Sequence, residues 1–412
     1  MSPYLDMNTT LSPEQLALKN GVHQFAQAVL RPAAIALDKL AAPAEVIAPG
    51  SPLWSALKAS YAQGFHTALI PKQCGGLGLT GLELHLALEE LGWASAEFTA
   101  AIAVAGFPFA VVAQSGNADL IAELVTPFVN DKEARMVGCW AITEPDHGSD
   151  QFMAGTPEFY DARISGQVTA RPDGDHFVIN GTKAAWLSNG TIATHAITFL
   201  TLDPSKGLAG GGVAFVPLNL PGVSKGKPLD KMGQRALNQG SIIFDNVKIP
   251  KRYLLVDSSA YEFVLQQTLV LTNAAVAAMF VGLARAAYEE ALAYSKARIQ
   301  GGKPICEHQL VQKHLFDMFT KVETARALSR GVMVYNASTP TPAIEFAISA
   351  KTYCTQAAFE VANTALQLFG GKGLMREYHI EKLFRDARAA LIEDGVNDIL
   401  ALVGARKIVD RK

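Results

Sequence analysis

Three glycines near residue 80 form the first pattern in the sequence that suggests chemistry. Gly76, Gly78 and Gly81 match the G-x-G-x-x-G spacing that lets a backbone approach the pyrophosphate of a dinucleotide at the start of a helix. That fingerprint needs a preceding strand within a βαβ unit, but Pro71 interrupts the segment before it and no alternation of strands and helices follows. We therefore interpret these glycines as a loop before a helix that begins near Leu82.

Several common catalytic signatures do not occur in the sequence. It contains no G-x-x-x-x-G-K-[ST], no H-E-x-x-H and no G-x-S-x-G, which argues against a phosphate-binding loop, a zinc protease and a serine hydrolase. His308 and His314 do not have the spacing of metal ligands. We predict no metal site and no disulfide framework, because no CxxC pair occurs among the four cysteines, which are Cys74, Cys139, Cys306 and Cys354.

Two strings in the middle of the chain are more specific than these single motifs. The first reads I-T-E-P-D-H-G-S-D from Ile142 to Asp150, and the second reads W-L-S-N from Trp186 to Asn189. Together with G-G-K-G at 370–373 and R-D-A-R at 385–388, they resemble the acyl-CoA dehydrogenase family, and the resemblance covers nearly the whole chain. A capped loop with Asp and Ser turns would explain G-S-D alone, but not the whole first string.

The resemblance implies a soluble FAD-dependent enzyme with three domains. The implied fold is α+β and mainly α: an N-terminal α-helical domain at 1–133, a middle β-barrel or β-sandwich domain at 134–252 and a C-terminal four-helix bundle at 253–412. It also implies a homotetramer or a homodimer, because some cofactor contacts in this family come from a neighbouring subunit.

The resemblance assigns roles along the flavin ring. Ile142 and Thr143 would contact the edge of the isoalloxazine, and Ser149 would contact both the cofactor and the thioester side of the substrate. Trp186 would pack against the ring, and Ser188 would direct its hydroxyl towards N5, where hydride arrives. An aromatic residue on a strand is by default part of a core, so core packing is the alternative for the tryptophan.

A second group of residues is implied to contact the rest of the cofactor across a subunit boundary. An arginine at the end of a long helix suits the FAD pyrophosphate, because its guanidinium is a planar donor that stays charged, although a solvated cation at a helix end would have the same sequence. Paired glycines permit the backbone to approach the adenosine half closely. By resemblance these residues are Arg298, Gln300, Gln309, Gln367, Gly370 and Gly371, with Asn397 as a further polar contact to the cofactor.

The residue in the position of the catalytic base departs from the family. Family members usually carry Glu-Gly-Thr near the carboxyl end, and the register from R-D-A-R places Asp394, Gly395 and Val396 there. Aspartate is shorter than glutamate by one methylene, about 1.5 Å of reach, and a misplacement of about 1 Å can cost roughly 100-fold in rate. Glu393 is the rival base.

Some family members place the base on the first long helix of the C-terminal domain. The register there gives Thr272 followed by Asn273, and neither side chain is a base. We predict that both residues bind substrate, together with Ser149 and Gly395.

The implied reaction is α,β-dehydrogenation of an acyl-CoA, in the catabolism of fatty or other carboxylic acids. The α-proton would go to Asp394 and the β-hydride to N5 of FAD, and the electrons would pass to an electron-transferring flavoprotein. An enzyme like the nitroalkane oxidases of the same superfamily is a competing hypothesis, since these use aspartate, but they also carry a downstream arginine where this chain has Ala401. A desulfinase-like enzyme and a non-catalytic subunit of a heteromeric dehydrogenase are two further hypotheses.

The element pattern agrees with an order of helices, then strands, then helices. Ser12, Pro13 and Gln15 form a capping box that begins helical structure, which continues to about Ala122. Alternation and turn residues dominate from Met136 to 250, including a hairpin at 168–179. Long amphipathic helices follow at 261–298, 306–331, 342–369 and 378–391, and a cleft between two helical bodies and a β domain suits a ligand site.

Composition excludes several classes of protein. The chain has 412 residues, is 49% hydrophobic and has a net charge of −2, so it can bury large cores and carries no strong electrostatic footprint for nucleic acid. We expect no membrane span, because the most apolar stretch at 269–284 is short, and we expect a cytoplasmic location, because the first residues lack a secretory or transit pattern. The segment between Asp150 and Gly166 is longer than is usual in the family and lies near the expected substrate entrance.

Overall fold

The N-terminal part of the computed structural model is helical, and the structure describes residue 7 and residues 10–411. The expected capping box is confirmed: the Gln15 N–H donates to Ser12 Oγ at 3.2 Å, and the Ser12 N–H donates to Gln15 Oε1 at 3.1 Å. The helices of this part are α1 (Pro13–Phe25), α2 (Arg31–Asp38), α3 (Pro43–Val46), α4 (Pro52–Ala62), α5 (Gly81–Ala94), α6 (Ala96–Gln114), α7 (Ala118–Leu120) and α8 (Thr126–Asn130).

Gly76 and Gly78 lie in a loop before α5, as predicted from the missing βαβ context. A Cβ on Gly76 would lie 2.2 Å from the carbonyl oxygen of Ile70, so this glycine serves a close approach within the loop. Helix α5 begins at Gly81, one residue before the predicted start.

The middle of the chain forms one mixed sheet. Its strand order is β6-β7-β3-β2-β4-β5-β8, and β1 pairs with β4 in parallel. The predicted hairpin is confirmed, with Asp173 opposite His176 and Thr169 opposite Asn180. The strands are β1 (Gly138–Ala141), β2 (Thr169–Asp173), β3 (His176–Lys183), β4 (His195–Thr201), β5 (Gly211–Pro217), β6 (Val223–Lys225), β7 (Ile242–Pro250) and β8 (Leu254–Val256).

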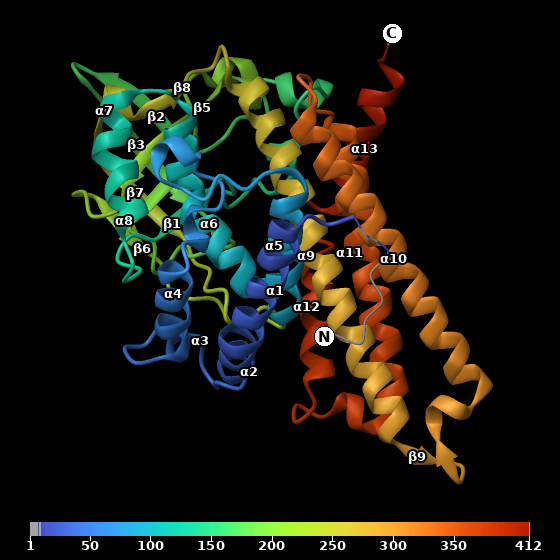
Figure 1. Cartoon of the computed structure of the whole chain (residues 1–412). Coiled ribbons are helices and arrows are strands. Elements are labelled where there is room, and N and C mark those ends of the chain that lie inside the picture. Colours follow the sequence, from blue (N-terminus) through green and yellow to red (C-terminus); the bar gives the residue numbers. More distant parts are fainter. Residues whose placement is uncertain (1–6, 8–9, 412) are drawn as a thin grey trace.

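Long helices form the C-terminal part beside the sheet (Figure 1). They are α9 (Tyr261–Ala297), α10 (Gln309–Ser338), α11 (Ile344–Phe369), α12 (His379–Ala389) and α13 (Asn397–Val409). A short hairpin of β9 (Ile299–Gln300) and β10 (Lys303–Pro304) joins α9 to α10 at the end of the bundle. The four predicted helices are present, but α10 extends seven residues beyond its predicted end at 331, and α13 is a further helix that was not predicted.

Helix α9 is also in direct contact with α5 from the N-terminal part. A Cβ on Gly92 would lie 2.2 Å from the carbonyl oxygen of Met279, and one on Gly282 would lie 2.1 Å from that of Glu89. The two helices can therefore cross this closely only because both positions are glycine. This crossing fixes α5 to the bundle, although the two helices are far apart in the sequence.

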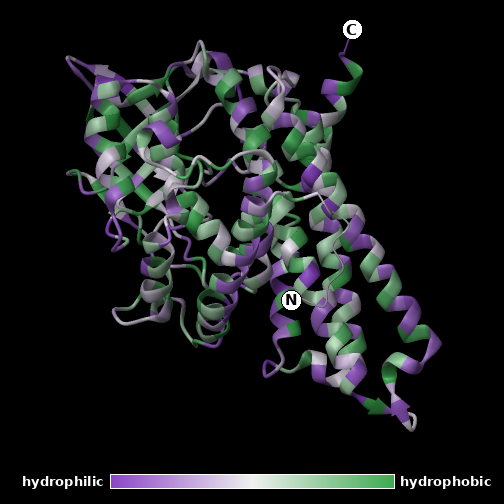
Figure 2. Cartoon of the chain, in the orientation of Figure 1, coloured by the Kyte–Doolittle hydropathy of each residue, from purple (hydrophilic) through white to green (hydrophobic). Residues whose placement is uncertain are grey.

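Two helices within the described ranges are long and apolar enough to cross a membrane by length and composition: α6 and α9. Most of their apolar windows are buried inside the protein, 78% for α6 and 83% for α9, as is usual for core helices. Figure 2 shows hydrophobic and hydrophilic residues interspersed around the long helices of the bundle. The stretch at 269–284 is mostly buried within α9.

A buried cluster of charges holds α5, α9 and α10 together. The carboxylate of Glu89 accepts hydrogen bonds from Arg285 at 3.0 Å, Arg326 at 2.9 Å and Arg330 at 3.1 Å, and its side chain is 1% exposed. Burial alone would raise the pKa of Glu89, but the three guanidinium groups hold this pKa well below its usual value. The carboxylate therefore stays charged and compensates buried cations from two other helices.

We predict that Glu89→Gln lowers the free energy of unfolding by about 3–5 kcal/mol, because it removes a counter-charge that three buried guanidinium groups share. Urea unfolding of the purified protein measures this loss. Glu133→Gln is the control: it breaks the exposed Lys58–Glu133 pair and should cost less than about 1 kcal/mol. Equal losses in the two variants would contradict this account of the cluster.

Candidate active site

The turn between α12 and α13 carries the predicted base. Asp394 has a φ of +50° and Gly395 a φ of +94°, so both residues adopt left-handed backbone conformations. A side chain at residue 395 would also meet Leu400, with 2.9 Å from a Cβ to Cδ2. Glycine is thus required after the base, whereas aspartate is one of the few other residues that tolerate such a conformation.

A lysine from α11 holds this turn. Lys351 is 0% exposed, and its Nζ donates to the carbonyl oxygen of Gly395 at 2.7 Å and to Asn397 Oδ1 at 2.8 Å. Sequence reasoning missed this residue. The available signal was its place on the apolar stripe of α11, four residues after buried Ala347 and three before buried Cys354.

Asp394 and Glu393, the two candidate bases, differ in what their carboxylates contact. Glu393 Oε1 accepts a hydrogen bond from Gln234 Nε2 at 2.9 Å, whereas the Asp394 carboxylate has no hydrogen-bond or ion-pair partner in the described part of the chain. Burial raises the pKa of Asp394 to about 6, opposed by the charge of Lys351. Burial and the neighbouring Asp394 raise the pKa of Glu393 to about 7. Asp394 is therefore the carboxylate that is free to take a proton near neutral pH.

The loop that contains Ser149 contacts residues 394–397, which we call the base turn. The N–H of Val396 donates to Ser149 Oγ at 2.9 Å, so the serine hydroxyl keeps its own proton for another acceptor. Ser149 and Gly395, predicted to bind substrate, are thereby brought together from positions almost 250 residues apart in the sequence.

The two strings of the middle part are joined to each other. Thr143 Oγ1 donates to the carbonyl oxygen of Ala184 at 2.9 Å, and the Ala184 N–H donates to that of Thr143 at 3.0 Å. Lys183 donates to the carbonyl oxygen of Ile142 at 2.8 Å and forms a buried ion pair with Glu144 at 2.6 Å. These contacts fix the backbone beside which a flavin edge is predicted to lie.

Trp186 lies outside the core and in the loop after β3, not on a strand as predicted. Its side chain is 61% exposed, and its carbonyl oxygen accepts a hydrogen bond from Gln239 Nε2 at 3.1 Å. The same Nε2 lies 3.4 Å from Ser188 Oγ. An exposed indole beside a backbone held by Thr143 fits a planar aromatic cofactor, so these residues suit the flavin of FAD.

Thr272 and Asn273, the remaining predicted substrate contacts, lie on α9. The Asn273 Nδ2 donates to the carbonyl oxygen of Leu269 at 3.0 Å. Thr272 Oγ1 and Asn273 Oδ1 are buried and have no hydrogen-bond partner among the residues that the structure describes. Unsatisfied buried polar atoms are rare in proteins, but both of these atoms are covered by the protein itself, so their role in substrate binding stays a prediction.

The predicted contacts to the pyrophosphate and adenosine are not brought to the base turn within one chain. Tyr294 stacks on Phe369 with ring centroids 4.0 Å apart, which places the end of α9 beside the end of α11. This end carries the β9–β10 hairpin and lies away from the middle sheet (Figure 1). The residues there are Arg298, Gln300, Gln309, Gln367, Gly370 and Gly371, whereas Asn397 lies at the base turn bound to Lys351.

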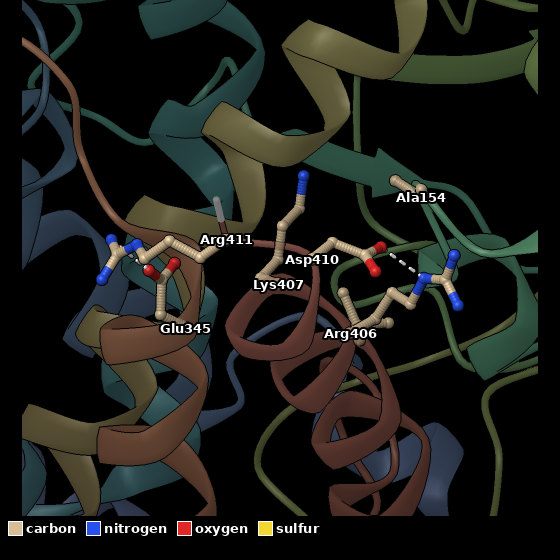
Figure 3. Close-up of a pocket in the computed structure, with 8 residues that line it drawn as sticks. Ala154, Glu345, Arg406, Lys407, Asp410 and Arg411 are labelled. Atoms are coloured by element: carbon tan, nitrogen blue, oxygen red, sulfur yellow. Dashed lines mark hydrogen bonds and ion pairs between the residues drawn. The ribbon is translucent and has the colours of Figure 1, made fainter.

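A polar cavity of about 360 Å³ lies between the segment after Asp150 and helix α13. Figure 3 shows two ion pairs at its wall, Arg406 with Asp410 and Arg411 with Glu345, while Lys407 stands between them and is joined to neither. Its lining residues are Ala154, Gly155, Glu345, Val403, Arg406, Lys407, Asp410 and Arg411.

Comparison with known proteins finds the same family along the whole chain. Three family models match: the acyl-CoA dehydrogenase N-terminal domain at residues 12–132, the middle domain at 139–247 and the C-terminal domain at 263–409. The chain belongs to the acyl-CoA dehydrogenase family. The family is FAD-dependent, and the expected three-part fold with a middle β domain is confirmed.

Named relatives of this acyl-CoA dehydrogenase act on different acyl groups. The mitochondrial short-chain specific acyl-CoA dehydrogenase of Rattus norvegicus is 31% identical over 94% of this chain and 88% of its own length. The cyclohexane-1-carbonyl-CoA dehydrogenase of Geobacter metallireducens is 30% identical over 97% of this chain and 98% of its own. The solved butyryl-CoA dehydrogenase of Megasphaera elsdenii has a TM-score of 0.85 and 27% identity, and the match covers 98% of this chain and all of that one.

We predict that Trp186→Ala weakens FAD binding roughly tenfold or more, because it removes an aromatic face and its buried area. Trp186→Phe should retain most of the affinity. Titration of the apoprotein with FAD, followed by quenching of flavin fluorescence, measures both. Leu16→Ala is the control, since this exposed leucine lies on α1. Unchanged affinity in the alanine variant at 186 would place the flavin elsewhere.

Proposed function

We propose that this acyl-CoA dehydrogenase removes the α-proton of an acyl-CoA with Asp394. The observation that carries the proposal is the free carboxylate of Asp394, raised in pKa to about 6 and placed one residue before a glycine turn that Ser149 and Lys351 hold. A base with a pKa just below the working pH is charged and still accepts a proton readily. Bound FAD supplies the acceptor for the β-hydride.

The backbone of the same turn can stabilise the thioester enolate. The N–H of Val396 is used by Ser149, but the N–H groups of Asp394 and Gly395 have no hydrogen-bond partner in the described residues. Backbone donors aimed at a carbonyl oxygen stabilise negative charge that develops on it. Asp394 would then act through its carboxylate on the α-proton and through its N–H on the carbonyl.

The shorter reach of aspartate is offset by the shape of the turn in this proposal. Because Asp394 and Gly395 are both left-handed, the turn can carry the backbone of residue 394 further towards the substrate. A backbone that lies closer to the substrate would compensate for the methylene that aspartate lacks relative to glutamate. It would also bring the N–H of residue 394 closer to the thioester oxygen.

The cavity beside α13 supports a coenzyme A substrate. Lys407 donates to Gln266 Oε1 at 3.1 Å and, within the described ranges, has no carboxylate partner, unlike Arg406 and Arg411. A phosphate group of the coenzyme would be attracted to this cation. The segment after Asp150 forms the facing wall, and Tyr160 fixes it to α9 by donating to Glu262 at 2.7 Å.

The exposed end of the bundle supports assembly of several copies. Arg298 directly precedes β9, which lies at the end of the bundle away from the middle sheet, so one copy would complete the cofactor site of another, in a homodimer or homotetramer (Figure 1). We further propose that the reduced flavin passes its electrons to an electron-transferring flavoprotein, in the cytoplasm.

Aspartate as the base also favours a second candidate, oxidation of a nitroalkane. Residue 401 is an exposed alanine on α13 rather than an arginine, which counts against this candidate. The Asp394–Gly395 turn with its free N–H groups instead suits a carbonyl oxygen.

We predict that the yellow holoenzyme bleaches under anaerobic conditions with at least one acyl-CoA. Butyryl-CoA, isovaleryl-CoA, cyclohexane-1-carbonyl-CoA and 3-phenylpropanoyl-CoA form a first screen, followed by flavin absorbance near 450 nm (about the usual maximum for oxidised flavins). Nitroethane is the comparison substrate and should leave the flavin oxidised. Bleaching by nitroethane and by none of the thioesters would overturn the proposed function.

We predict that Asp394→Asn retains bound FAD but slows bleaching by at least about 1,000-fold, since it removes the base. Glu393→Gln is the matched control, because it removes the adjacent carboxylate that Gln234 already binds. It should keep more than about one tenth of the rate. If Glu393→Gln is inactive and Asp394→Asn is active, Glu393 is the base.

A further inference from the structure

Lys351 is buried among groups that do not neutralise it. Its two hydrogen-bond acceptors, the carbonyl oxygen of Gly395 and Asn397 Oδ1, carry no net charge. Asn397 is itself oriented by Thr355, whose Oγ1 accepts from Nδ2 at 3.0 Å. A buried ammonium group without a counter-charge is costly, so a nearby carboxylate must compensate it.

The compensating charge comes from the base turn. Burial lowers the pKa of Lys351 to about 8, and the charges of Asp394 and then Glu393 oppose this shift. In return, the ammonium group favours the charged form of Asp394. The lysine is therefore coupled to the base through charge and to the turn through its hydrogen bonds.

We propose that Lys351 is a positioning residue that holds the 394–397 turn in its catalytic shape and favours the carboxylate form of Asp394. This inference rests on the proposed role of Asp394 as the base. It assigns to the buried lysine of α11 a part in catalysis although it lies behind the turn rather than against the substrate.

Lys351 acts on both carboxylates of the turn, and its coupling to Asp394 is the stronger of the two. Glu393 is bound by Gln234 from the middle part, and the rise in its pKa is opposed by the charge of Lys351 and then by that of Lys231, which lies in the same loop as Gln234. Lys231 itself donates to Leu237 O at 2.7 Å and Gln239 Oε1 at 2.9 Å. On α12, Asp386 is paired with Lys382, so these two groups compensate each other.

We predict that Lys351→Met moves the acid limb of the pH–rate profile upwards by about one pH unit or more, because loss of a nearby positive charge raises the pKa of a carboxylate. The wild-type limb should lie near pH 6, below which Asp394 is protonated. The experiment measures the first-order rate of anaerobic bleaching between pH 5 and 9 (a range of about two units on each side of neutral). Its substrate is the fastest of the thioesters in the first screen.

Two further variants separate charge from packing. Lys351→Arg keeps the charge and should keep the acid limb near its wild-type position even if its rate is lower. Lys321→Met is the matched control, because it removes a lysine of α10 that pairs with Glu360 of α11 at the partly exposed surface. Its profile should match that of the wild type.

An unchanged acid limb in Lys351→Met, with FAD bound, would overturn the inference. If that variant does not bind FAD, the Asn397→Asp variant tests the inference instead. A carboxylate 2.8 Å from Nζ would neutralise the positive charge of Lys351 and should shift the acid limb of the pH–rate profile to higher pH. The Asp394→Asn variant distinguishes failure of the proposed function from failure of the proposed role of Lys351. If it still bleaches normally, the proposed function fails; if it is inactive and the limbs of the Lys351 and Asn397 variants are unchanged, only the role of Lys351 fails.

Discussion

The candidate site depends on a turn that the chain could not hold by itself. Asp394 and Gly395 both have left-handed backbones, and such a pair is stable only where surrounding groups fix it. Lys351 binds it from α11, and Ser149 binds it from the middle part. The placement of the carboxylate is thus a property of three separate segments, and neither Lys351 nor Ser149 forms a hydrogen bond with the reactive side chain of Asp394.

Buried charge connects the rest of the fold to this turn. The Glu89 cluster joins α5 to α9 and α10, and a second cluster joins α6 to α12, where Lys382 donates to Glu97 at 2.6 Å. Asp386, the partner of Lys382, also accepts from the N–H of Gln234, and Gln234 in turn binds Glu393. Because buried ion pairs tolerate little displacement, these contacts fix the helices on both sides of the base in one arrangement.

The sequence predicted this fold well where a pattern or a family string was present. The Ser12 capping box, the hairpin at 168–179 and the rejection of a dinucleotide motif at Gly76 follow from local rules that tertiary structure did not override. Helix α13 was not named, since it follows the base turn directly and is only 13 residues long. Its short apolar pattern is hard to distinguish from that of a loop.

The site was predictable only in part, for a physical reason. The family strings indicate which residues gather at the flavin and the base, but their individual roles remain predictions. Lys351 lies outside every string, and its importance depends on a carbonyl oxygen 44 residues further along the chain. A polar residue within an apolar stripe signals a buried partner, but sequence alone does not identify that partner.

The glycine contact between α5 and α9 has a mechanical consequence for the predicted substrate residues Thr272 and Asn273. Since each helix backbone already touches the other at Gly92 and Gly282, the helices cannot move closer, and any side chain there would force them apart. Thr272 and Asn273 lie on the same continuous helix as Gly282, so a wider separation of the two helices at Gly282 would tilt α9 and displace both residues. A change at this glycine contact would therefore displace the two predicted substrate residues, although Gly92 and Gly282 are not themselves predicted to contact the substrate.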